Sequence, residues 1–122
     1  MKKSIVFIAV CVALAACHKK PQELIIGKWK PETGSFDMAS MTFNNNGTVN
    51  VQRGMDSTDT MLFGYKLSDD GKQILVYPAD KIPTSFKEDR DLHQELADIV
   101  KLDNDSLVVK GDQDYHRFSR VR

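Results

Sequence analysis

The sequence predicts an all-β fold, a small antiparallel up-and-down β-barrel of about eight strands. Two observations carry this prediction. Short apolar or alternating runs recur along the chain from residue 24 onward, and tight-turn signals such as Asn-Gly and Asp-Gly separate them. Sequential hairpins with one apolar face are typical of a meander, and closure into a barrel removes the exposed strand edges.

The first three strands follow directly from this pattern. A strand is expected at Leu24–Lys30, where Pro31 ends it, and another at Met38–Phe43. Asn44-Asn45-Asn46-Gly47 predicts a hairpin turn, because Asn and Gly tolerate positive φ, and the chain returns at Thr48–Gln52.

Two further hairpins are expected. Thr60–Leu67 alternates apolar and other residues, a turn follows at Asp69-Asp70-Gly71, and Gln73–Tyr77 is the partner strand. Near the C-terminus, strands are expected at Ser106–Lys110 and Tyr115–Val121, joined by a short turn.

Residues 78 to 93 form the longest irregular stretch, which could act as a lid over the barrel. Ser85-Phe86-Lys87-Glu88 fits a capping box, so a short helix near residues 85–92 is expected there.

The segment at residues 92–102 can be interpreted in two ways. Leu92, Leu96 and Ile99 recur at helical spacing, which would extend the helix. We favour a strand at Glu95–Leu102, ended by Asp103-Asn104-Asp105.

The first sixteen residues have the pattern of an export signal. A positively charged start is followed by the apolar stretch Ser4–Ala13, which is too short to span a bilayer. Leu14-Ala15-Ala16-Cys17 resembles the lipobox of bacterial lipoproteins, in which the signal is cut before the cysteine and that cysteine is lipid-modified. The alternative is an ordinary signal peptide with a chance cysteine.

The lipobox resemblance implies three regions: a lipoprotein signal peptide at 1–16, a lipidated Cys17 with a polar tether at 17–23, and a barrel domain at 24–122. The membrane is then a partner through the lipid on Cys17, since two or more acyl chains anchor a protein stably. His18 stands where an aspartate is linked with inner-membrane retention, and no acidic run follows the cysteine. An outer-membrane anchor facing the periplasm is therefore expected.

Composition narrows the classes of partner. Removing the signal from the 122-residue chain leaves 106 residues, with a formal charge of about −2 and a single cysteine. No cluster of Lys and Arg with interleaved aromatic residues occurs, so nucleic acid is not an expected partner.

A second resemblance concerns the domain itself. Gly27-Lys28-Trp29, preceded by Leu24-Ile25-Ile26, resembles the opening G-x-W of the lipocalin and calycin superfamily. Met41–Thr48 and Ile99–Leu107 are similar to segments of small lipocalin-like lipoproteins of Bacteroidetes. The resemblance implies that Trp29 plugs one end of the barrel and that an arginine of the last strand stacks on it, with Arg120 the candidate and Arg117 the alternative.

The lipocalin resemblance also implies that the barrel binds a small apolar ligand. The candidate pocket residues are those of the apolar strand faces: Met41, Phe43, Met61, Phe63 and Tyr65. The chain is much shorter than a full lipocalin, so a solid core is the alternative. In that case the protein would be a protein-interaction or inhibitor module that displays loops.

No enzyme, cofactor or metal site is expected. The sequence has no G-x-S-x-G motif, and its three histidines, His18, His93 and His116, are scattered. Four methionines between residues 38 and 61 could hold Cu(I), but the positions of Met41 and Met61 fit a barrel core better.

Overall fold

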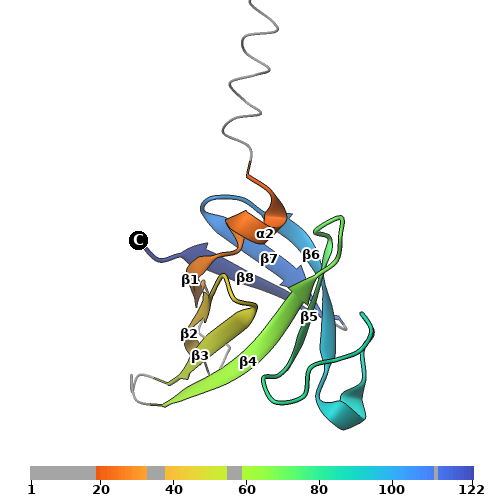
Figure 1. Ribbon diagram of the computed structural model, residues 1–122. Coiled ribbons are helices and arrows are strands. Elements are labelled where there is room, and N and C mark those ends of the chain that lie inside the picture. The colour runs from red at the N-terminus through yellow and green to blue at the C-terminus, as the bar shows by residue number, and fades with distance from the viewer. Residues whose placement is uncertain (1–18, 33–37, 55–58, 112) are drawn as a thin grey trace, which may run out of the picture.

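The fold is a closed barrel of eight antiparallel strands in chain order (Figure 1). The computed structural model describes residues 19–32, 38–54, 59–111 and 113–122. The strands are β1 (Gly27–Pro31), β2 (Met38–Phe43), β3 (Thr48–Arg53), β4 (Thr60–Leu67), β5 (Gln73–Pro78), β6 (Glu95–Leu102), β7 (Ser106–Lys110) and β8 (Tyr115–Arg120). Strand β8 pairs with β1 and closes the ring. The predicted all-β up-and-down barrel is therefore confirmed.

The start of the barrel differs from the expected strand at Leu24–Lys30. Helix α2 (Pro21–Leu24) precedes β1, with Pro21 at the first helical position, where its missing N–H costs nothing. Part of the segment expected to be a tether, 17–23, is therefore helical. Strand β1 ends at Pro31, one residue later than expected. Pro31 is paired with Phe118 at the seam with β8, a terminal position that a proline tolerates.

The strand interpretation of residues 95–102 is confirmed, because β6 pairs with both β5 and β7. Leu92 and Leu96 do not share an apolar face with Ile99: Leu92 is exposed, whereas Ile99 packs against the core. A register shift between Ile99 and Lys101 breaks the alternation of β6. The helical spacing of the three residues is coincidental, because Leu92 precedes the strand, Leu96 pairs with outward-facing Leu75, and Ile99 faces the core.

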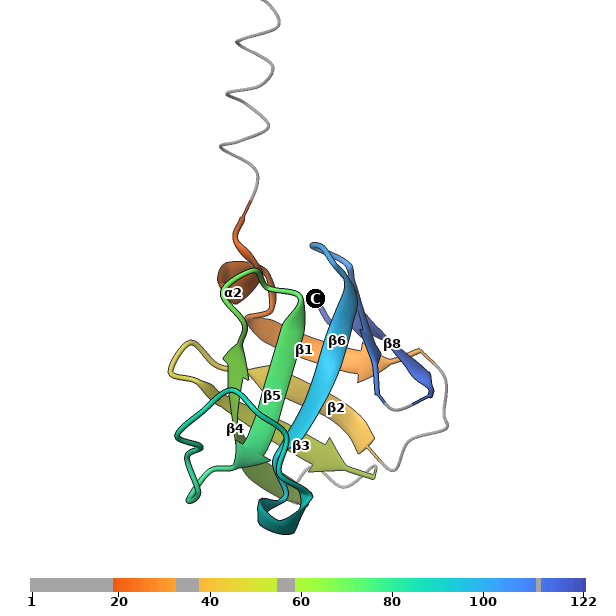
Figure 2. The ribbon, with the colours of Figure 1, turned by 90° about the vertical axis from the view of Figure 1, so that its right-hand side faces the viewer.

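The long segment after β5 packs on the outside of the barrel, and Figure 2 shows it passing in front of β4 and β5. Lys66 Nζ donates to Pro83 O across 3.4 Å. Leu75 and Tyr77, which alternate with the inward residues of β5, are buried on this outer face. The structure thus places residues 79–94 against the barrel wall, which differs from the lid expected at 78 to 93.

Only one helical turn occurs in that segment, the 3₁₀-helix η1 (Arg90–Leu92). It begins after the expected capping box, and Asp89, whose side chain accepts from the Asp91 N–H, caps it instead of Ser85. Glu88 accepts from the Leu96 N–H at 3.4 Å and pairs with Arg90 at 3.6 Å. The Glu88 carboxylate therefore ties the loop to β6 and Arg90, so the capping-box interpretation of Ser85–Glu88 was wrong.

The two ends of the barrel are built differently. The end that carries α2 also carries three tight turns, at 44–47, 68–72 and 103–105, and we call it the closed end (Figure 1). The opposite end carries the longer connections, including residues 79–94, and we call it the open end.

The turns of the closed end are held by short polar side chains. Asp103 Oδ1 accepts from the N–H groups of Asp105 at 2.9 Å and Ser106 at 2.8 Å. These two bonds hold the pKa of the Asp103 carboxyl below its usual range. At the equivalent turn before β5, hydrogen bonds from the Ser68 hydroxyl and the Lys72 N–H lower the pKa of Asp70.

Replacing Asp103 by alanine should lower the midpoint of thermal unfolding at about pH 7. A carboxyl group whose pKa is lower in the folded state stabilises the fold above its unfolded pKa and loses that effect as the pH falls through the folded value. The difference in unfolding midpoint between Asp103→Ala and the parent protein should therefore disappear at about pH 2. Thermal unfolding followed by circular dichroism would measure it, with exposed Asp69→Ala as the control. A difference that persists unchanged in acid would contradict the turn's dependence on the carboxylate.

Candidate functional site

Trp29 occupies the interior at the closed end. Its side chain is fully buried, and its indole Nε1–H donates to Ile25 O at 2.9 Å. Ile25, just after α2, is itself fully buried beside it. Burying an indole together with its N–H requires such an acceptor, so the turn after α2 is part of the tryptophan's site.

Arg120 covers the same ring from the last strand. Its guanidinium carbon lies 4.3 Å from the centroid of Trp29, a cation–π distance. The guanidinium also donates to three backbone carbonyls, those of Asn104 at 2.6 Å, Ile26 at 2.8 Å and Leu24. Desolvation is the main cause that lowers the pKa of Arg120. One side chain thus joins the segment before β1, the turn before β7 and strand β8.

Gly27 makes room for this arrangement. Its φ is +133°, a conformation that residues with a side chain rarely adopt. A Cβ at this position would also collide with Arg120 Nη1. The glycine of the G-x-W motif is therefore required both by the backbone and by the arginine that packs against it.

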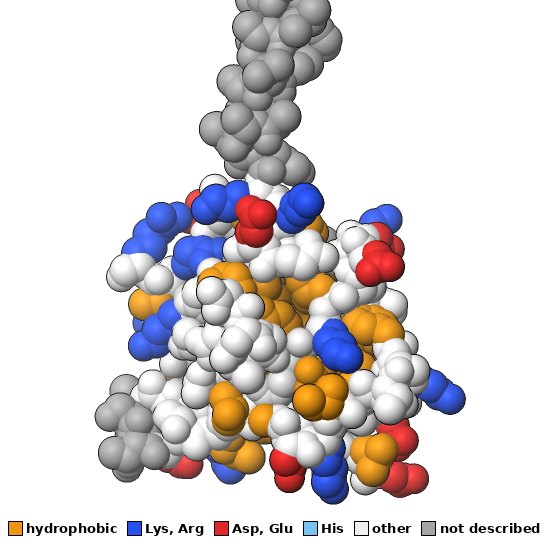
Figure 3. Space-filling view, viewed as in Figure 1, with side chains coloured by type: hydrophobic (Ala, Val, Ile, Leu, Met, Phe, Trp, Pro, Cys, Tyr) orange, Lys and Arg blue, Asp and Glu red, His pale blue; other side chains and the backbone are white. Residues whose placement is uncertain are grey.

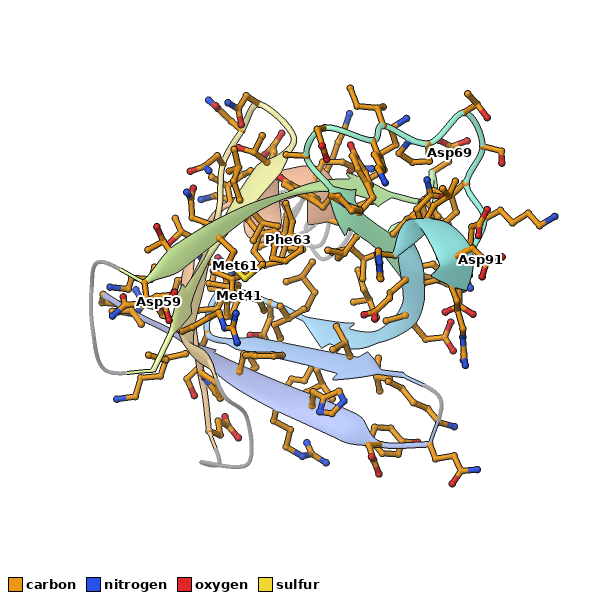
Figure 4. The ribbon with its side chains drawn as sticks, turned by 90° about the horizontal axis from the view of Figure 1, so that it is seen from below. Met41, Asp59, Met61, Phe63, Asp69 and Asp91 are labelled. Atoms are coloured by element: carbon orange, nitrogen blue, oxygen red, sulfur yellow. The ribbon has the colours of Figure 1, made fainter. Side chains whose placement is uncertain are left out.

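Burial of the inward-facing side chains falls from the closed end to the open end. Along β4, Tyr65 is 8% exposed, Phe63 is half-buried and Met61 is 40% exposed. Along β8, Phe118 is buried and His116 half-buried. Figure 4, which views the open end, shows Met41, Met61 and Phe63 directed into the barrel. Packing is thus tight in one half, while the other presents an accessible apolar wall.

The closed half of the interior is filled by aromatic packing. Phe43 and Tyr65 meet edge to face, with ring centroids 4.9 Å apart and an interplanar angle of 88°. The Tyr65 hydroxyl donates to Asn44 O at 2.9 Å, and burial raises the pKa of this phenol. These two rings act as the floor beneath the accessible wall.

Comparison with known structures gives one relevant similarity. A lipocalin-like protein from Bacteroides uniformis superposes with a TM-score of 0.56 and 16% sequence identity, covering 80% of this chain and 99% of that one. The fold is lipocalin-like. Neither a model of a known protein family nor a curated protein matches the sequence.

The structure divides the five candidate pocket residues of this lipocalin-like barrel into two groups. Met61 and Phe63 belong to the open half, and Met41, Phe43 and Tyr65 belong to the packed core. All five share the inner face of β2 to β4, in the register that pairs Met41 with Val51 and Val51 with Met61. Met41, Phe43 and Tyr65 are thus core residues with little surface to offer a ligand.

Sequence reasoning missed half of the open wall. Ala97, Ile99 and Val109, on β6 and β7, are partly buried and pack against the core from the other side of the barrel. The alternation of Ala97 with Ile99 along β6 could have found that part of the wall, but the competing helical interpretation obscured it. His116, which pairs with Val109, adds a polar group to this wall.

A separate recess of about 330 Å³ lies at the closed end, outside the lipocalin-like interior. Its walls are mostly polar and include Lys19, Glu23, Arg120 and Arg122. Arg120 is already bound to three carbonyls, and Arg122 pairs with Asp105. The Arg120 guanidinium is therefore committed to holding this end of the barrel together, whereas Arg122 forms an exposed ion pair.

Other kinds of site receive no support within the described residues. There, no group of three His, Cys, Asp or Glu side chains is placed to hold a metal ion. The same part of the chain contains no helix of the length and hydropathy needed to cross a membrane. Cys17, the predicted lipidation site, lies outside the described residues.

Removing the arginine that covers Trp29 should destabilise the lipocalin-like barrel. Arg120→Ala should lower the free energy of unfolding by about 2–4 kcal/mol, because it removes the cation–π contact and leaves three carbonyls without their donor. Arg120→Lys should lower the free energy of unfolding less than Arg120→Ala does, because lysine keeps the charge but lacks the planar fork of the guanidinium. Urea unfolding followed by the fluorescence of the single tryptophan would measure both.

The matched control is Arg117→Ala, which removes an exposed arginine from the same strand. Its free energy of unfolding should stay within about 0.5 kcal/mol of the parent value. Equal losses for Arg117→Ala and Arg120→Ala would contradict the special role of the stacked arginine.

Proposed function

We propose that this protein is a lipid-anchored envelope lipoprotein whose lipocalin-like barrel binds a small apolar molecule at its open end. The role is one of binding, without catalysis. The observation that supports ligand binding is the fall in burial along the inner face, which leaves Met61 and Phe63 accessible above a packed floor. Apolar side chains exposed in a concave site gain by covering themselves with an apolar ligand.

Two features of this wall suit a ligand that is held without covalent bonds. Methionine side chains are flexible and polarisable, so the accessible Met61 can adapt to the shape of a ligand. The floor of Phe43 and Tyr65 is rigid, which limits the ligand to the open half. The site therefore favours a small molecule or the end of a larger one.

The anchor rests on the sequence. We propose that Cys17 carries the lipid and that the protein is held at the outer membrane, facing the periplasm. Cys17 precedes Lys20 by three residues, a span of at most about 11 Å, and α2 begins one residue later at the closed end. The lipid would thus attach near the closed end, with the open end directed away from the membrane.

A second candidate function is a protein-interaction or inhibitor module. It is favoured by apolar side chains exposed on the outer segment, with Ile82 69%, Leu92 42% and Phe86 37% exposed. Figure 3 shows apolar side chains reaching the surface over the middle and lower parts of one face, whereas charged groups surround the end near α2. Exposed apolar patches often mark sites of protein contact.

Two phenylalanines distinguish these functions. Native mass spectrometry of residues 19–122, which contain the whole closed barrel, should show an added mass that is lost on denaturation. Phe63→Ala should weaken its binding by about five- to thirtyfold, the equivalent of about 1–2 kcal/mol of lost apolar contact. Phe86→Ala, on the outer segment, should leave binding unchanged. If only Phe86→Ala has an effect, and that effect is on capture of a protein, the second function is correct.

The anchor is tested by removing its thiol. Cys17→Ser should move the protein from the membrane fraction to the soluble fraction, because the thiol that carries the lipid is lost. Mass spectrometry of the N-terminal peptide of the parent protein should show acyl chains on Cys17. Cys11→Ser, within the predicted signal, is the matched control and should remain membrane-bound. An unmodified N-terminus at another residue would establish an ordinary signal peptide.

A further inference from the structure

One cationic side chain stands at the rim of the open half. Arg53 is the last residue of β3, two positions beyond Val51 and four beyond Val49, whose side chains face inward. Alternation along a strand therefore places Arg53 on the inner face. An independent contact agrees, since Arg53 Nη1 donates to the sulfur of Met61, an accessible residue of the inner wall, at 3.3 Å.

This guanidinium has capacity to bind an anion. A thioether sulfur is a weak acceptor, whereas a guanidinium has five N–H donors in a planar fork suited to carboxylate or phosphate. Among the described residues, no carboxylate lies within ion-pair distance of Arg53. Its backbone N–H donates to Asp59 O, which fixes the strand end and leaves the side chain for other partners.

Other polar groups also lie near this rim. Asp59, just before β4, is opposite Arg53, and its backbone carbonyl accepts from the Arg53 N–H. Glu95, paired with Val76, lies at the rim on β6, and His116 lies on β8. Arg53 belongs to β3, next to the methionines of β2 and β4. The side of the open half formed by β2 to β4 thus combines an apolar wall with the guanidinium of Arg53, which is not within ion-pair distance of the Asp59 carboxylate.

We infer that the open half binds a single-chain amphiphile, with its apolar chain against Met61 and Phe63 and its anionic head on Arg53. This inference rests on the proposed apolar site and adds the class of ligand. The head group supported by this geometry is a carboxylate or a phosphate, because both accept two parallel bonds from a guanidinium. A free fatty acid and a lyso-lipid phosphate share that chemistry.

The test compares probes that differ only in their head group. Residues 19–122 would be titrated calorimetrically with dodecanoate, dodecyl phosphate, dodecanol and dodecyltrimethylammonium, each below its micelle concentration. At least one anionic probe should bind about tenfold or more tightly than dodecanol, and the cation most weakly. Raising the salt concentration should reduce this preference. Whether the carboxylate or the phosphate binds more tightly identifies the source of the head group.

Arg53→Gln should reduce the affinity for the anionic probe to that for dodecanol, while the affinity for dodecanol itself is unchanged. Arg53→Lys should retain part of the preference, and exposed Arg117→Gln, a matched control, all of it. If dodecanol binds as tightly as both anions, or Arg53→Gln leaves the preference intact, the inference is overturned and the apolar site remains. If no probe binds, the proposed apolar site fails as well.

Discussion

The contact between Arg120 and Trp29 is the interaction on which the rest of this barrel depends. The indole fills the closed end, and the guanidinium covers it while binding carbonyls from the segment between α2 and β1 and from the turn before β7. A protein of this size without a disulfide in its barrel has little stability to spare. A buried aromatic ring with a charged cover at the seam gives both apolar burial and a fixed alignment of the first and last strands.

Because the closed end is tightly packed, the fold can tolerate partly exposed side chains at the open end. Phe43, Tyr65 and Leu107 complete a packed half, so the inward-facing residues beyond them need not fill the barrel for the fold to persist. Their partial exposure is unfavourable in the empty protein, and a ligand would relieve it. The stabilising contacts and the proposed binding site thus lie in opposite halves of the barrel.

Most of the fold was predictable because its strands are short, alternating and joined by turns with characteristic residues. β2, β4, β6 and β7 have the expected bounds, and Arg120 of the two candidate arginines lies over Trp29.

What could not be predicted depends on contacts distant in sequence. The apolar run at Leu24–Ile26 reads as a strand, yet two of its carbonyls bind Arg120, nearly a hundred residues away. The Ser85–Glu88 pattern likewise does not form a capping box, because the Glu88 carboxylate accepts from the Leu96 N–H of β6. The open half was only partly found, because residues 92–102 also fit a helical spacing and the wall formed by β6 and β7 was therefore not recognised.

The seam that Arg120 secures also has a kinetic consequence. Every hairpin of the barrel is local, but the pairing of β1 with β8 joins residues separated by almost the whole domain. Loop-closure entropy opposes such a contact until the intervening hairpins have formed, so closure is expected to be the late and slow event of folding. A growing chain cannot complete its core before the last strand has been synthesised. The barrel is therefore held open throughout translation by its own topology, which is the condition a chain needs if it must cross a membrane before it folds.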